Sequence, residues 1–150
     1  MRAILVFLHL FGQVAWLGGS LAAMTIGIAS QRENKDQLGP TVRFQSAIYR
    51  SLIAPGALVV VLSGILLTLN MYNQATAVGL SSALMAMQGL GILGALIILV
   101  YTLPKSTKLA RLEPGGQAAA IFQGLRRKVV MSGMIASTLG MLALVAAALR

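Results

Sequence analysis

Four long apolar stretches dominate the chain and limit the kinds of structure that it can form. They cover residues 3–29, 51–71, 80–103 and 129–149. Each holds roughly the 20 residues that a helix needs to cross a hydrocarbon core about 30 Å thick. Only 10% of all residues are charged, whereas about a quarter is usual in a soluble domain. The sequence therefore predicts an all-α, integral membrane four-helix bundle that forms a single domain over residues 1–150.

The basic residues predict the orientation of this bundle. Apart from the arginines near the two chain ends, every Lys and Arg lies in the first connection, residues 30–50, or in the third, residues 104–128. The second connection, residues 72–79, has none. Basic connections stay on the cytoplasmic side of a membrane, so we expect both termini outside, in the inner membrane of a prokaryotic cell. The basic residues of the two connections are Arg32, Lys35, Arg43, Arg50, Lys105, Lys108, Arg111, Arg126, Arg127 and Lys128.

This distribution also explains the formal net charge of +9. The charges separate apolar stretches, as a topology signal does, and they form no patch for nucleic acid. We expect membrane lipid around the chain and no nucleic-acid partner. A homo-oligomer or a larger membrane complex is the expected assembly.

Several kinds of chemistry are excluded by residues that the sequence lacks. There is no cysteine, which excludes disulfides, thiolate metal sites and covalent attachment of haem. The three acids, Glu33, Asp36 and Glu113, all lie in the predicted cytoplasmic connections. Ion-coupled transporters usually keep charged side chains within the membrane. The apolar stretches contain no such side chain, which argues against transport.

His9 is the only histidine, and it lies inside the first apolar stretch. Lipid offers an imidazole no hydrogen-bond partner, so the ring needs a partner or a metal within the bundle. Gln13, Trp16 and Ser20 follow on the same helical face. Two interpretations remain open. Either His9 is a hydrogen-bonded polar residue and Trp16 packs beside it, or a ring nitrogen of His9 binds a metal, for which we expect the iron of haem b.

Methionines in the predicted outer half are candidates for a second ligand. They are Met71 near the end of the second stretch, Met85 and Met87 of the third, and Met141 of the fourth. A thioether is an axial ligand of haem iron and a soft ligand of Cu(I), although each of these side chains could also simply fill the core. Met85 and Met87 point to different sides of a helix, so at most one of them can join His9. A single histidine leaves His/Met ligation, five-coordinate iron, or a haem shared between protomers.

Small residues and prolines predict how the helices pack and where they end. Glycine or alanine at four-residue spacing allows close helix approach in lipid. We expect Pro55 in the first turn of the second helix and Pro104 at the end of the third. The small-residue pairs are Ala15 and Gly19, Gly91 and Ala95, and Ala136 and Gly140.

The segment LHLFGQVAWLGGSL, residues 8–21, resembles the first helix of copper-resistance D (CopD)-like membrane proteins. It is also similar to the small four-helix proteins typified by HemJ-type protoporphyrinogen oxidase, which carry a histidine in helix one before a W-x-x-G segment. Residues 48–67, with a proline and a later glycine, resemble the start of the second helix in both groups. The resemblance implies His9 as a haem or metal ligand, with Trp16, Gly18, Gly19, Pro55 and Gly64 as scaffold.

Two positions depart from the HemJ-type pattern. Met87 and Gln88 stand near the place of its helix-three lysine, and residues 130–133 replace its Asn-Glu-Pro stretch. Both departures argue against protoporphyrinogen oxidation. The functional hypotheses are therefore haem binding for electron transfer or tetrapyrrole handling, copper handling, and a structural accessory subunit without a cofactor. His9, Gln13, Trp16, Met85, Met87 and Met141 are the predicted cofactor-binding residues, with His9 as the metal ligand.

Overall fold

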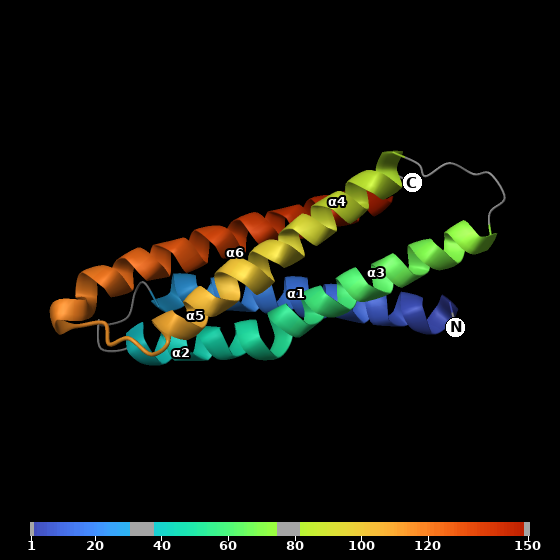
Figure 1. Cartoon of the computed structure of the whole chain (residues 1–150). Coiled ribbons are helices and arrows are strands. Elements are labelled where there is room, and N and C mark those ends of the chain that lie inside the picture. The colour runs from blue at the N-terminus through green and yellow to red at the C-terminus, as the bar shows by residue number, and fades with distance from the viewer. Residues whose placement is uncertain (1, 31–37, 75–81, 149–150) are drawn as a thin grey trace.

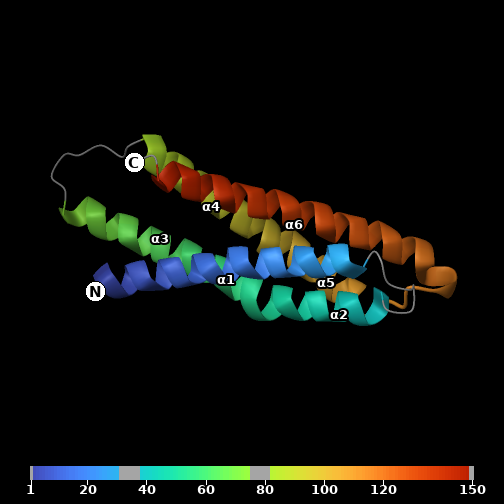
Figure 2. The same cartoon turned by 180° about the vertical axis from the view of Figure 1, so that it is seen from behind.

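The computed structural model describes residues 2–30, 38–74 and 82–148, and the side chains of residues 71–74 are outside the description. Within these ranges the chain is almost entirely helical and contains no strand. Four helical rods lie side by side, and both chain ends lie at the same end of the bundle (Figures 1 and 2). The all-α four-helix bundle predicted from the sequence is confirmed.

Each rod is long and apolar enough to cross a membrane. The first is α1 (Arg2–Ala29). The second comprises α2 (Leu38–Ile48), the π-helical turn η3 (Tyr49–Ile53) and α3 (Ala54–Gln74). The third comprises α4 (Ser82–Leu96), the π-helical turn η4 (Ile97–Thr102) and α5 (Leu103–Leu109). The fourth is a short 3₁₀ turn, η5 (Gly116–Ala118), followed by α6 (Ala119–Ala148).

The last three rods are longer than the sequence predicted, and the extra length lies mainly at the end of the bundle away from the termini. The predicted bounds 51–71, 80–103 and 129–149 were wrong there, because much of the two basic connections is helical. The candidate spans 38–70 and 116–148 have 33 residues each, which corresponds to about 50 Å of helix. The extensions α2 and α5 pack against each other. Arg43, Arg50, Lys105 and Lys108 lie on helical segments and not in loops.

Pro55 and Pro104 do not begin or end a rod, contrary to expectation. Each lies just after a π-helical turn inside a continuous helix. A proline has no N–H to donate to the carbonyl four residues earlier, and its ring crowds that carbonyl. Here the ladder shifts by one residue before each proline, since the N–H of Ala54 bonds to the carbonyl of Tyr49 and that of Leu103 to Ile98. The wider turn lets the helix continue past the proline.

The most extensive helix contacts are those of α1 with α3 and of α4 with α6. The first pair meets at Gly12 and Gly56. A Cβ at residue 56 would lie 2.7 Å from the backbone nitrogen of Trp16 and 2.8 Å from the carbonyl oxygen of Gly12. Only glycine allows the two backbones to approach this closely.

Trp16 joins the two helix pairs. Its indole is fully buried, and it packs into a recess where α4 and α6 carry Gly94 and Gly140. Ala136, on α6, is also fully buried beside Gly94. Of the predicted small residues, Ala136 and Gly140 thus lie at close helix contacts, and so does Gly19 against Ile53. Gly91 does not, because a Cβ there would meet nothing within 4 Å.

Candidate functional site

A cavity of about 450 Å³ lies between the helices in the half of the bundle that holds both termini. All four rods contribute to its wall, through residues of α1, α3, α4 and α6. Along α1 it extends from Arg2 to Trp16, a rise of roughly 21 Å. Most of its wall is aliphatic. Cavities of this size, apolar with a few polar groups, are typical of small-molecule and cofactor sites.

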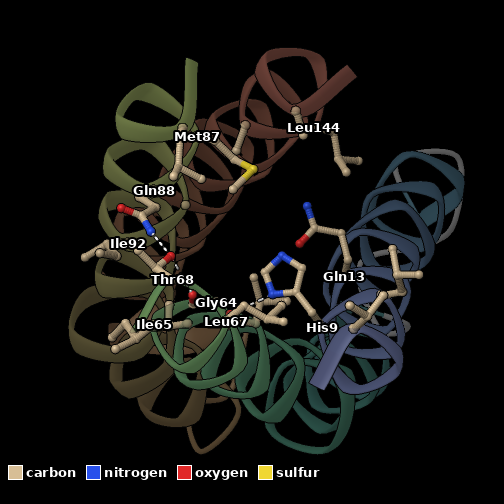
Figure 3. Close-up of a pocket in the computed structure, with 18 of the residues that line it drawn as sticks. His9, Gln13, Gly64, Ile65, Leu67, Thr68, Met87, Gln88, Ile92 and Leu144 are labelled. Carbon is tan, nitrogen blue, oxygen red and sulfur yellow. Dashed lines mark hydrogen bonds between the residues drawn. The ribbon is translucent and has the colours of Figure 1, made fainter. Parts of the chain in front are cut away.

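His9 projects from α1 into this cavity (Figure 3). Its Nδ1 lies 3.0 Å from the carbonyl oxygen of Val60 and 3.1 Å from the hydroxyl oxygen of Ser63. A carbonyl can only accept, and the Ser63 hydroxyl donates its own proton to the carbonyl of Val59. The proton of the neutral imidazole therefore sits on Nδ1. This leaves the lone pair of Nε2 free as an acceptor or as a metal ligand.

Gly64 creates the space that the imidazole occupies. A Cβ at residue 64 would lie 3.2 Å from Cε1 of His9 and 3.5 Å from its Nδ1. The ring thus lies directly over α3, within reach of the Val60 carbonyl one turn earlier. On one face of α3, Gly64 thus sets the location of the His9 ring and the Val60 carbonyl sets its tautomer. A histidine bound to metal through one nitrogen commonly donates its other N–H in this way.

Gln13 and Trp16 carry two buried polar atoms that lack a hydrogen bond among the described residues. These are Oε1 of Gln13 and Nε1 of Trp16, and the two side chains are 8% and 0% exposed. Both side chains line the cavity, and Gln13 points into it (Figure 3). Unpaired buried polar atoms cost roughly 1–3 kcal/mol each. Ser20, the last residue of the predicted stripe, instead bonds to the carbonyl of Trp16.

The candidate methionines of the third and fourth stretches differ in their placement, and the side chain of Met71 lies outside the described residues. Met87 lines the cavity and directs its sulfur into it from α4, across from His9 (Figure 3). Met85 is 60% exposed and Met141 is 52% exposed, and neither is part of the cavity wall. The structure therefore does not bring Met85 or Met141 to His9. The expectation that only one of Met85 and Met87 faces this side agrees with their placement.

A polar bridge in the cavity wall was not predicted from the sequence. The side-chain nitrogen of Gln88, on α4, donates to the hydroxyl of Thr68, on α3, and Thr68 in turn donates to the carbonyl of Gly64 (Figure 3). This bridge links the two helix pairs beside the His9 ring. The sequence does show that Gly64 and Thr68, four residues apart, lie on one helical face. It does not show that Gln88 of another helix is the partner of Thr68.

The donor set limits the metal chemistry of the cavity. Among the described residues there is no group of three His, Cys, Asp or Glu side chains that could hold a metal ion. One imidazole nitrogen and one thioether remain, in a space far larger than a single ion fills. The arrangement suits a large planar ligand that brings most of its own coordination, better than it suits a bare ion.

Comparison with known proteins gave no match: no family model, curated protein or solved structure is significantly similar to this chain.

Proposed function

We propose that this chain is a haem-binding protein of a prokaryotic inner membrane, with His9 as the axial ligand of haem b. Its role is electron transfer or tetrapyrrole handling, alone or as a small subunit of a larger membrane complex. The observation that carries the proposal is the Nδ1 contact of His9 with the Val60 carbonyl, 3.0 Å long. It holds the proton on the ring nitrogen that faces α3 and leaves Nε2 for iron.

The surroundings of His9 support haem over the alternatives. The cavity volume of about 450 Å³ and its aliphatic wall suit a macrocycle. Bound haem would supply one-electron chemistry at its iron. The chain would supply the imidazole, the Met87 thioether as a second ligand, and a largely aliphatic wall. A Cu(I) site needs several soft ligands close together, and the exposure of Met85 and Met141 removes two of those expected.

Binding can be tested by adding ferric haem to the purified protein in a neutral detergent. We expect a saturable Soret band at one haem per chain. If Met87 is the second ligand, Met87→Leu will lower the midpoint potential, because a thioether stabilises ferrous iron, and will convert the spectrum to a high-spin form. Met85→Leu is the matched control, since that side chain is 60% exposed outside the cavity.

Equal spectra and potentials in the two methionine variants would exclude Met87 as a ligand and leave five-coordinate iron or a haem shared between protomers. No Soret band in the wild-type protein would reject haem binding. In that case copper found by elemental analysis would favour copper handling, and the absence of both would favour a structural accessory subunit.

We also propose that the end of the bundle with both termini faces away from the cytoplasm, because the basic residues gather at the opposite end. The chain has no cysteine, so single cysteines report sidedness without background. Ser82→Cys at the start of α4 is expected to react with a membrane-impermeant maleimide added to intact spheroplasts. Gln117→Cys, between α5 and α6, is expected to react only after the membrane is opened. The opposite pattern would reverse the orientation.

A further inference from the structure

One charged side chain, Arg2, lines the cavity. It lies in the first turn of α1, seven residues before His9, and the two share a helical face. The rise between them is about 10 Å, with Val6 between them on the same wall. The cavity thus has a coordinating nitrogen in its interior and a guanidinium near the bundle end.

The described residues provide no partner for this arginine. Among the described residues the single ion pair joins Arg43 and Glu113, at the opposite end of the bundle. Arg2 also does not help to orient the bundle. Basic residues favour the cytoplasmic side, whereas Arg2 lies at the end with the termini, which we propose faces away from the cytoplasm. A cation that neither pairs within the described protein nor serves the orientation is available to a ligand.

We infer that Arg2 binds a carboxylate of the molecule that occupies the cavity, and so fixes which end of that molecule faces outward. The inference rests on the proposed function, in which the occupant is haem and the carboxylates are its propionates. A guanidinium binds a carboxylate through two parallel hydrogen bonds. Pairing at the bundle end also keeps the carboxylates near water, whereas carboxylates turned inward toward Trp16 would lose their hydration.

The test compares two ligands that differ only in their carboxylates: ferric protoporphyrin IX and its dimethyl ester. Both are titrated into the purified protein in dodecyl maltoside free of phospholipid, and binding is followed by the Soret band. The wild type is expected to bind the free acid about fivefold more tightly than the ester, the upper range for a solvent-accessible ion pair. Arg2→Gln is expected to remove this preference and Arg2→Lys to keep part of it.

Lys128→Gln provides a matched control, since it removes the same charge from α6 at the other end of the bundle and is expected to keep the full preference. Equal affinities for acid and ester in the wild type would overturn the inference and leave haem binding intact, as would an undiminished preference in Arg2→Gln. Failure of both ligands to bind would overturn the proposed function together with the inference. A preference that disappears only when phosphatidylglycerol is added would show that Arg2 also accepts a lipid phosphate, and would support the assignment of an anion site.

Discussion

Replacing His9 by alanine is expected to weaken haem binding by more than about 100-fold. Substitution of residues that merely orient a metal ligand already costs 10- to 100-fold in metal affinity, so loss of the ligand itself must cost more. The bundle should remain folded, because the imidazole fills part of the cavity wall and bridges to α3 only through Nδ1. The measurements are a haem titration followed at the Soret band and a thermal melt by circular dichroism.

Phe11→Ala is the matched control for this variant. It also removes an aromatic ring from α1, but Phe11 is 60% exposed and does not line the cavity, so haem binding should be unchanged. Added imidazole is expected to restore a Soret band in His9→Ala by entering the vacated space over Gly64. Haem affinity that persists in His9→Ala, with no response to imidazole, would remove His9 from the site.

Replacing Gly56 by alanine is expected to destabilise the bundle by about 3 kcal/mol, at the upper end of the usual effect of overpacking. The added methyl group would lie within 3.0 Å of two backbone atoms, the nitrogen of Trp16 and the carbonyl oxygen of Gly12. Backbone atoms of a helix cannot turn aside as a flexible side chain can, so α1 and α3 must separate. The free energy of unfolding can be measured by titration with sodium dodecyl sulfate in mixed micelles.

The separation of α1 from α3 should also weaken haem binding, because the contact between His9 and Val60 spans the same two helices. Gly18→Ala is the control, since nothing lies within 4 Å of its added methyl group, and its effect is expected to stay within about 0.5 kcal/mol. If the two glycine variants unfold alike, the close approach of α1 and α3 contributes little to stability.

The sequence predicted the helical class, the four rods and the face of α1 that carries His9, Gln13 and Trp16. These features depend on hydropathy and on the helical repeat, which are local properties of the chain. The continuation of the helices past Pro55 and Pro104 was not predictable in this way. It depends on a one-residue shift of the hydrogen-bond ladder, and proline on its own indicates a helix end as readily as a π-helical turn.

The candidate site was predicted only in part, for a similar reason. His9 stood out because an imidazole in lipid needs a partner, but the identity of that partner, the Val60 carbonyl, depends on how α1 and α3 pack. Helix geometry predicts that Met85 and Met87 point to different sides, but it does not predict which of them faces the cavity. The bridge between Gln88 and Thr68 and the place of Arg2 in the cavity wall likewise arise only when separate helices are brought together.

The pairing of α1 with α3, and of α4 with α6, bears on how the protein is made. Among the described residues, the hydrogen-bond partners of His9 are Val60 and Ser63 on α3, and both have been synthesised before α4 is translated. The orientation of the His9 ring can therefore be set while the second half of the chain is still being translated. The later helices, α4 and α6, then add the rest of the cavity wall, including the side chain of Met87.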